Sequence, residues 1–590
     1  MARLFLLALL LLLNSETVFA QVAVTADEAY QYLQSQRTRA RAVVGRAEKP
    51  PTDSLQKAVR ILQQALVYYR QPAVTALAKT SQSLYFRQSD LLFDLAVLQS
   101  RLGQPERAVA TLQSLLTPEF AEVYAPWMLT HPALAAVRQH PLLKPTLDQT
   151  ATLQNVFDSP ALTTGYRPTL TAAEKAAGLS KLWSEAKYNF AYFDHLPGLD
   201  WDQLYLDYLP KVQATASTVA YYRVLQQFYA QLHDGHTDVW ANDGPVADSV
   251  YGRPPITAHL VEGRVLVQQV RSDSLRRTGL VPGLEIVRID HLPATVYANR
   301  FVRPYQSGST KQNVDVQTYT YHLLSGPKTR PVQVEFRDRG GQRFSRTLPR
   351  SGYGKPAPFV PVRLRFLPGN VAYLQVNEFE TDAGFRRFVA AFDSLQATRA
   401  LIIDLRQNGG GNSSNGYRIL SYLTDHRYRV GRYQSRTYSA VGRARGQGVR
   451  FEPVDTANFR SPAGGQNFYA KPVAVLISGQ TFSAAEDFCS AYVGLQRGAL
   501  LGEPTGGSTG QPLSFALPGG LMARVCTKRD AYPDGTEWNG QGIQPTLVIH
   551  PTVAAIQAGK DPVLAAALHH LTTPVRTGKQ ASAQTKRGHP

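Results

Sequence analysis

The sequence predicts a multidomain α+β protein in which helical regions come first, a β domain follows, and a layered α/β core comes last. Three observations support this fold class. The chain has 590 residues, more than one domain usually holds. Apolar residues recur at helical spacing up to about residue 240. From residue 358 onward, short apolar runs alternate with helical segments, as in α/β layers.

Residues 1–20 read as a signal peptide. Arg3 gives a positive start, Leu4 to Leu13 is an unbroken apolar run, and Val18-Phe19-Ala20 resembles a cleavage site. A membrane-spanning helix needs about 20 apolar residues, which this run does not reach. We therefore expect an exported protein, periplasmic or secreted, with no stable membrane insertion after cleavage behind Ala20.

The composition excludes several classes of function. The formal net charge is +19, but Lys and Arg are spread along the chain and no nucleic-acid-binding module is present, so no nucleic-acid partner is expected. The two cysteines, Cys489 and Cys526, are too few for a disulfide framework and lack metal-ligand spacing. One bridge between them stays possible, with two buried thiols preferred. No metal or cofactor is expected.

Residues 21–165 are predicted to form an N-terminal helical domain. The segment "LLFDLAVLQSRLGQPERAVATLQSLL" (91–116) resembles one tetratricopeptide unit, and "SLQKAVRILQQALVYY" is a weaker second. Such units need about three neighbours to bury their faces, so a plain helical bundle is an equal alternative. Residues 166–250 continue as an aromatic-rich helical subdomain.

A β domain is predicted for residues 255–350. "GRVLVQQV" is typical of a strand, and "RPVQVEFRD" and "QRFSRTLPR" read as a hairpin around a Gly-Gly turn. This stretch resembles a PDZ domain of the type inserted into exported proteases. That resemblance implies capture of peptide tails by strand addition.

The last large unit, residues 356–555, alternates strands and helices. "GNVAYLQVNEF", "RALIIDLRQ" and "PVAVLIS" are strands, each followed by a helical segment. The order predicts a layered α/β core. This core resembles the crotonase and ClpP folds. Residues 556–590 are expected to hold a C-terminal helix and a disordered basic tail.

Ser483 in "VAVLISGQTFSAAEDF" admits two interpretations. A buried strand precedes it, a helix opens at Ala484, and Glu486 completes a Ser-x-x-Glu capping box. The serine is then a helix cap, or it is a nucleophile presented by a strand-to-helix turn. The same turn geometry serves both.

Two other segments carry candidate chemistry. Asn408-Gly409-Gly410-Gly411 follows a strand and lets backbone N–H groups approach a ligand, but it matches no phosphate-loop spacing. "YAQLHDGHTDV" supplies His233 and His236, which are helix-end residues, metal ligands or a general base. A metal would need further ligands.

Six segments in order resemble the C-terminal processing peptidase family of serine peptidases, close to the tricorn core protease. They are "LHDGHT", "GLVPGLEIVRID", "LIIDLRQNGGGN", "VAVLISGQTFSAAED", "GEPTGGSTG" and "GQGIQPTL", within residues 170–550. The resemblance implies that Ser483 is the nucleophile and His236 the general base of an acyl-enzyme mechanism. It also implies an oxyanion hole made by the N–H groups of Gly410 and Ala484.

The chain departs from the family pattern in two places. One branch activates its serine with a lysine, but none lies between Lys471 and Lys528, so the Ser-His branch is indicated. Where that branch has its acidic residue this chain has Asn539, so Glu537 is predicted to orient the histidine, with Asp534 second. Gly235 stands where the tricorn tetrad has a serine.

The predicted function is therefore an exported serine endopeptidase, or C-terminal processing peptidase, that acts on protein or peptide substrates. Two alternatives come from other classes. One is a catalytically inactive binding protein on the same fold, as in the retinoid-binding members of the family. The other is an acyl-CoA enzyme of the crotonase type, which a signal peptide disfavours.

Overall fold

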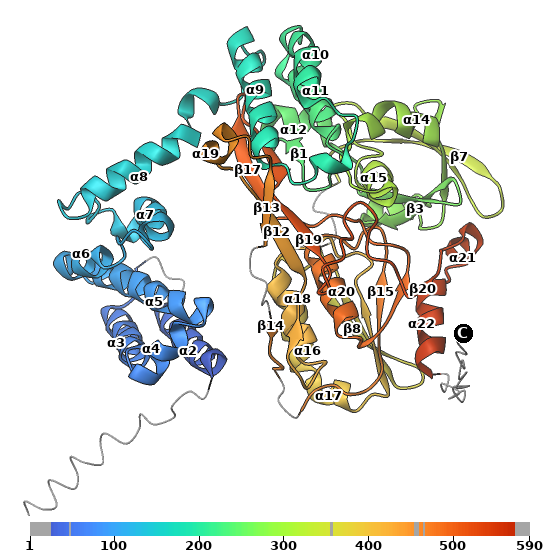
Figure 1. Cartoon of the computed structure of the whole chain (residues 1–590). Helices are drawn as coiled ribbons and strands as arrows, with labels where there is room; N and C mark the ends of the chain where they lie inside the picture. Colours follow the sequence, from blue (N-terminus) through green and yellow to red (C-terminus); the bar gives the residue numbers. More distant parts are fainter. Residues whose placement is uncertain are drawn as a thin grey trace, which may run out of the picture. The chain divides into compact units, whose positions relative to one another are not determined.

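The computed structural model describes residues 25–45, 49–157, 159–353, 358–453, 459–463 and 467–572. The predicted signal peptide, residues 1–20, and the predicted tail beyond residue 572 lie outside the described residues. The chain divides into two compact units, Met1–Ser159 and Pro160–Pro590, drawn in Figure 1. Helices and several sheets occur together, so the predicted multidomain α+β class is confirmed.

The first unit is helical, as predicted. Thr25 opens it with a complete capping box to Glu28. Apolar faces pack into two cores, one among the first four helices and one among the next three. The tetratricopeptide-like assignment stays a prediction. The helices are α2 (Ala26–Val44), α3 (Thr52–Tyr69), α4 (Pro72–Ala78), α5 (Gln82–Arg101), α6 (Pro105–Gln113), α7 (Ala121–Thr130), η1 (Pro132–Leu134) and α8 (Lys144–Phe157).

The second unit begins with aromatic-rich helices that share a core with a hairpin from far along the chain. Trp201 stacks on Phe228 with ring centroids 4.5 Å apart. Strand β1 (Asp238–Trp240) pairs antiparallel with β18 (Leu521–Cys526), which also pairs with β17 (Pro512–Leu517). The predicted helical subdomain therefore shares its core with β17 and β18, which come from the C-terminal part of the chain. Its helices are η2 (Pro160–Leu162), α9 (Ala172–Asn189), η3 (Phe193–His195), α10 (Trp201–Gln213), α11 (Thr218–Ala230) and α12 (Gly244–Val250).

A six-stranded antiparallel sheet with its own apolar core follows, in the order β2-β3-β4-β6-β7, with the short β5 also paired to β4. The predicted hairpin is confirmed by the β6–β7 register, Val332 opposite Leu348. The PDZ-like assignment stays a prediction. The elements are β2 (Ile256–Val261), β3 (Arg264–Val270), α13 (Asp273–Arg277), β4 (Glu285–Ile289), β5 (Leu292–Pro293), α14 (Ala294–Phe301), η4 (Arg303–Tyr305), α15 (Lys311–Asp315), η5 (Val316–Tyr321), β6 (Val332–Arg337) and β7 (Arg343–Leu348).

The core is a sheet in the order β20-β16-β15-β10-β9-β8, parallel except at β8. All five residues of β10 and all five of β15 are buried, as their apolar runs predict. Alternate residues face opposite layers: Leu401 and Ile403 face one helical layer, and Ile402 faces α22. The strands are β8 (Val362–Leu367), β9 (Val371–Val376), β10 (Ala400–Asp404), β15 (Val473–Ile477), β16 (Gly498–Gly502) and β20 (Leu547–Val548).

Helices cover both faces of this sheet, which confirms the predicted layered α/β core (Figure 1). One layer contains α16 (Ala383–Ala390), α17 (Phe392–Gln396), α18 (Ser413–Leu420) and α20 (Ala484–Gly494), and the other contains α22 (Pro562–Thr572). The remaining elements are β11 (Tyr428–Arg429), β12 (Arg432–Thr437), α19 (Ala440–Ala444), β13 (Arg450–Pro453), β14 (Phe459–Arg460), β19 (Lys528–Ala531) and α21 (Val553–Gln557).

Two further sequence predictions concern cysteines and membranes. Cys489 and Cys526 are free, buried thiols, so the preferred alternative to a disulfide is correct. Within the described residues, none of the helices has the length and apolar character required to cross a membrane.

Candidate active site

The carboxyl ends of two neighbouring parallel strands bring two turns together. β10 ends at Asp404 and leads into the glycine loop, whereas β15 ends at Ile477 and leads to Ser483. Because the strands pair in parallel, both turns leave the sheet at the same edge. Thr481 Oγ1 joins the two turns by donating to Leu405 O at 2.9 Å.

Ser483 adopts a backbone conformation that few non-glycine residues adopt, with φ 56° and ψ −124°. Such strain costs about 1–3 kcal/mol and persists only where the surroundings fix it. The Ser483 N–H donates to the Glu486 carboxylate at 3.0 Å, as in a capping box. Its hydroxyl instead lies 3.0 Å from His236 Nε2. The glutamate caps the turn while the serine hydroxyl meets the histidine.

His236 reaches Ser483 from the turn after α11, although the two residues lie 247 positions apart. The imidazole stacks on Phe482, with ring centroids 4.7 Å apart and planes 12° apart. Burial, followed by the charges of Arg524 and Lys528, lowers the pKa of His236 to about 3. The ring is therefore neutral near pH 7 and can accept a proton.

A second serine occupies the other side of the imidazole. Ser508 Oγ lies 3.0 Å from His236 Nδ1 and donates to Asp234 Oδ2 at 3.2 Å. Since the Ser508 proton goes to Asp234, its oxygen accepts from the Nδ1–H of His236. That tautomer leaves the Nε2 lone pair facing Ser483. The side chains form a continuous chain from Ser483 through His236 and Ser508 to Asp234.

Asp234 is a buried carboxylate that accepts several hydrogen bonds. The His236 N–H and the Thr237 hydroxyl each donate to Oδ1 at 2.9 Å, and Ser309 Oγ donates to Oδ2 at 3.3 Å. Burial raises the pKa of Asp234, while the hydrogen bonds from Thr237, His236, Ser508 and Ser309 oppose that rise. These donors compensate the carboxylate for its removal from water.

The β domain supports the turn that carries the histidine. Ser307 Oγ accepts from Asp234 N at 3.1 Å and donates to Asp234 O at 2.7 Å. Ser309 Oγ accepts from Gly235 N at 3.2 Å. The loop before α15 therefore fixes the backbone on the N-terminal side of His236.

Packing explains why Gly235 stands beside the histidine. A Cβ atom added at Gly235 would lie 2.7 Å from Phe482 Cζ and 2.9 Å from Asn313 Oδ1. The phenyl ring that stacks on His236 fills the space a serine side chain would need. The hydroxyl near Nδ1 comes instead from Ser508.

The prediction that Glu537 orients His236 is wrong. Both Glu537 oxygens accept from Arg529 at 3.0 Å, and the side chain is 36% exposed. An isolated antiparallel bridge between Ala531 and Glu537 fixes the residue beside the strand that carries Arg529. The second candidate, Asp534, is exposed and accepts the Thr536 N–H at 2.8 Å within its turn. Neither carboxylate bonds to the histidine.

The two residues predicted to form an oxyanion hole lie side by side. A Cβ atom on Gly410 would lie 2.7 Å from Ser483 Cβ and 3.1 Å from Ala484 N, so the two turns touch at this point. Ala484 is the first residue of α20, and its N–H meets no acceptor among the described residues. The Gly410 N–H, in contrast, donates to Asn408 Oδ1 at 2.9 Å. One predicted donor is free and the other is engaged locally.

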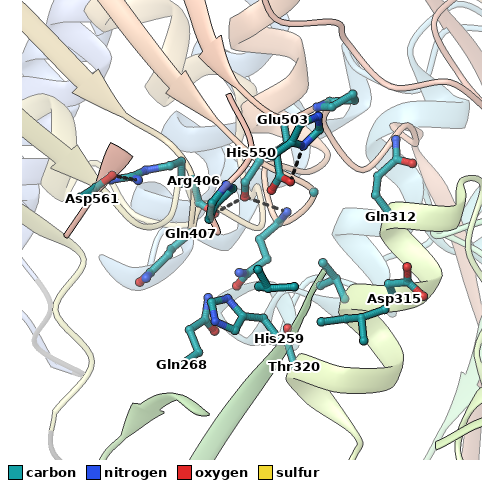
Figure 2. A pocket seen from close by; sticks show the side chains of 18 of the residues that line it. His259, Gln268, Gln312, Asp315, Thr320, Arg406, Gln407, Glu503, His550 and Asp561 are labelled. Atoms are coloured by element: carbon teal, nitrogen blue, oxygen red, sulfur yellow. Dashed lines mark hydrogen bonds and ion pairs between the residues drawn. The ribbon is translucent and has the colours of Figure 1, made fainter. Parts of the chain in front are cut away.

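Two cavities that share lining residues lie on this side of the core, and one of them contains Ser483. The smaller, of about 440 Å³, is lined by Ser483 and His236. The larger, of about 940 Å³, lies between the β domain and the carboxyl edge of the core sheet, and Figure 2 shows it from close by. Val316, Gly479 and Gln480 line both cavities. The cleft at Ser483 therefore continues into a larger space.

The larger cavity has polar walls in which most charges are paired. In Figure 2, Arg406 meets Asp561, and His550 meets Glu503. Arg406 also bonds Asp404, so one guanidinium joins the end of β10 to the residue before α22. Among the described residues, no group of three or more His, Cys, Asp or Glu is placed to hold a metal ion.

The sequence interpretation missed Asp234 and Ser508, although both lie inside quoted segments, "LHDGHT" and "GEPTGGSTG". Their roles depend on contacts across 272 and 274 residues, which no local pattern reveals. The adjacent His233 is exposed and does not take part.

The chain is similar in sequence to known peptidases. The model of peptidase family S41 matches residues 370–549, and that of the Tricorn protease C1 domain matches residues 171–230. A carboxyl-terminal-processing peptidase 2 (chloroplastic) of Arabidopsis thaliana is 25% identical over 289 residues, 48% of this chain and 49% of that protein. A carboxy-terminal-processing protease of Bartonella bacilliformis is 24% identical over 255 residues, 41% of this chain and 55% of that protein.

This chain spans about half the length of the curated relatives it matches. Among solved structures, mature CPAF complexed with lactacystin has a TM-score of 0.53 at 16% identity, over 66% of this chain and 96% of that chain. At that identity the likeness concerns the fold alone. The family models include the segments that carry Ser483 and the glycine loop, whereas His236 lies just beyond the C1 match.

Proposed function

We propose that this chain, whose S41 domain places it with the C-terminal processing and tricorn serine peptidases, hydrolyses peptide bonds through an acyl-enzyme on Ser483. The observation that carries the proposal is the contact of 3.0 Å between Ser483 Oγ and His236 Nε2. His236 is neutral and has its other nitrogen paired, as a general base requires.

The first step forms the acyl-enzyme. Ser483 Oγ attacks the carbonyl carbon of the scissile bond while its proton passes to His236 Nε2. The carbonyl oxygen becomes an oxyanion and accepts a hydrogen bond from the Ala484 N–H at the start of α20, where the helix dipole is favourable. The Gly410 N–H supplies a second bond once it exchanges Asn408 Oδ1 for the oxyanion.

The second half of the reaction reverses the proton flow. The C–N bond breaks, its electron pair stays on nitrogen, and His236 gives the leaving amine a proton. Water then attacks the ester with the same histidine as base and releases Ser483. During both steps the imidazolium is stabilised through Ser508, whose hydroxyl accepts from Nδ1 and donates to Asp234. Asp234 and Ser508 thus act as positioning residues.

The substrates we propose are proteins or peptides. The cleft at Ser483 opens into a cavity of about 940 Å³, enough for several residues of an extended chain. The PDZ-like sheet, of which β2 is one edge, borders this cavity and is proposed to hold a segment of the substrate. Residues 1–20 support export, so the proposed location is periplasmic or secreted.

The test is labelling with a fluorophosphonate probe, which forms a covalent adduct with activated serines. We expect one modified residue, Ser483, by peptide mapping, and no labelling of a folded Ser483→Ala variant. Absence of labelling in the folded wild-type protein would contradict the proposal and favour a binding protein on the same fold.

A further inference from the structure

Glu486 lies under the catalytic turn and is completely buried, at 0% exposure. Its two oxygens accept four hydrogen bonds. Oε2 accepts from Ser483 N at 3.0 Å and Ser508 N at 3.2 Å, and Oε1 accepts from Thr505 Oγ1 at 2.6 Å and Gly507 N at 2.7 Å. Four donors fill the acceptor sites of a carboxylate.

These donors come from two separate segments of the chain. Ser483 belongs to the turn after β15, whereas Thr505, Gly507 and Ser508 belong to the loop after β16. In a capping box, the only bond that the carboxylate accepts is the one donated by the N-cap N–H. Three of the four bonds therefore exceed what helix capping requires, and they reach the loop that carries Ser508.

The two backbone groups on Oε2 belong to the two residues that flank His236. Ser483 Oγ meets Nε2 and Ser508 Oγ meets Nδ1, each at 3.0 Å. One carboxylate oxygen thus joins the backbones of both hydrogen-bond partners of the imidazole. If either backbone N–H moves away from Glu486 Oε2, the distance between the two serines that flank the His236 imidazole changes.

The strained backbone of Ser483 makes its hydrogen bond to Glu486 important. Ser483 holds φ 56°, which persists only if the surroundings determine it. Without an acceptor for its N–H, the turn can relax toward an ordinary helix start and carry the hydroxyl away from Nε2. Full burial of a carboxylate costs desolvation free energy. A glutamate that only capped the helix could stay partly exposed and avoid that cost.

We propose that Glu486 is a positioning residue for peptide hydrolysis, which holds Ser483 and Ser508 at the separation that His236 needs. The inference rests on the proposed roles of Ser483 and His236. It predicts that substitutions at Glu486 slow acyl-enzyme formation while substrate affinity is retained, because Glu486 does not line the cavity at Ser483.

The test compares three variants of the full chain. Glu486→Gln presents an NH₂ group to backbone donors and removes acceptor capacity. Glu486→Asp keeps a carboxylate at N3, where it still reaches the Ser483 N–H but not the loop at Ser508. Asp487→Asn is the matched control, since that carboxylate, one residue along the same helical turn, bonds Ser413 and Thr509 instead.

We expect Glu486→Gln to lower kcat and the rate of fluorophosphonate labelling by about 10²-fold with KM within about twofold, the scale that misplacement of about 1 Å produces. Glu486→Asp should fall between wild type and Glu486→Gln, and Asp487→Asn should stay within about threefold of wild type. Wild-type kcat in folded Glu486→Gln, or an equal loss in Asp487→Asn, would overturn the inference.

Two outcomes keep this inference separate from the proposed function. If wild-type protein is labelled and folded Glu486→Gln is labelled at the same rate, Ser483 is a nucleophile and only the role of Glu486 fails. If the folded wild type is not labelled, the proposed function itself fails. Should Glu486→Gln not fold, Glu486→Asp decides, and wild-type kcat in that variant contradicts the positioning role.

Discussion

Ser508 Oγ lies 3.0 Å from His236 Nδ1, on the side of the imidazole opposite Ser483. A hydroxyl thus stands where the Ser-His-Asp triad places a carboxylate. The carboxylate of Asp234 is one hydrogen bond further out, at 3.2 Å from Ser508 Oγ. The negative charge of Asp234 therefore acts on His236 through the neutral hydroxyl of Ser508. This arrangement determines which substitutions we expect to affect activity.

Ser483→Ala is expected to abolish peptide hydrolysis while the protein stays folded. Loss of the nucleophile of a triad removes on the order of 10⁶-fold in kcat. The Ser483 N–H still meets Glu486, so the helix start is retained. Turnover of a fluorogenic peptide, normalised to folded protein by circular dichroism, measures this. Appreciable turnover by the variant would show that another group performs the chemistry.

Ser508→Ala and Asp234→Asn are expected to lower kcat without removing the nucleophile. Ser508→Ala leaves Nδ1–H without its partner, and Asp234→Asn leaves the Ser508 hydroxyl without its charged acceptor. The loss of a triad carboxylate costs up to about 10⁴-fold, so we expect about 10²-fold through an interposed hydroxyl. Steady-state kinetics of both variants test this, and a Ser508→Ala enzyme with full turnover would exclude the relay.

Glu537→Gln and Asp534→Asn are expected to leave turnover within about twofold of wild type. Glu537 pairs with Arg529 at a half-exposed site, where ion pairs contribute about 0–1 kcal/mol. These two variants also serve as controls for Asp234→Asn, since each removes one carboxylate. A large fall in kcat for Glu537→Gln would restore the assignment that the structure contradicts.

The pH dependence of activity should show no break near 6.5, the usual pKa of histidine. Burial and the charges of Arg524 and Lys528 lower the pKa of His236 to about 3, so the base stays neutral as pH falls from 7 to 5. Protonation removes the base only near pH 3. The pH profile of kcat/KM measures this. We expect His236→Ala to be inactive and His233→Ala to be active, because His233 is exposed.

Gly235→Ser is expected to destabilise the protein and reduce activity. The new Cβ would lie 2.7 Å from Phe482 Cζ, and overpacking of this kind costs about 1–3 kcal/mol. Because the same phenyl ring stacks on His236, the imidazole moves with it. A second substitution, Phe482→Leu, should recover part of the melting temperature. A Gly235→Ser protein with unchanged melting temperature and turnover would refute the steric explanation.

Local patterns predicted the parts of the fold that local physics determines. The apolar runs at Ala400–Asp404 and Val473–Ile477 are buried parallel strands, and the Ser-x-x-Glu pattern marks the start of a helix. The pair of Ser483 and His236 came from the resemblance to a family. That resemblance could not locate Ser508, because a serine in a glycine-rich loop carries no pattern of its own.

The failed assignment of Glu537 has a physical cause. Proximity in sequence to the position used by the family favoured Glu537 over other carboxylates. The antiparallel bridge to Ala531 instead places it beside Arg529, whose guanidinium takes both of its oxygens. Asp234, two residues before His236, could not be found from the sequence, because its carboxylate reaches the ring only through Ser508.

The sequence separation of 247 positions between His236 and Ser483 also has a consequence for biosynthesis. A ribosome produces His236 first and Ser483 much later, and contacts of such long sequence separation form slowly. A nascent chain that ends before β15 lacks Ser483, the proposed nucleophile, and a fragment of residues 370–549 lacks His236, the proposed base. Under the proposed function, hydrolytic competence requires both halves of the second unit to be synthesised and folded together.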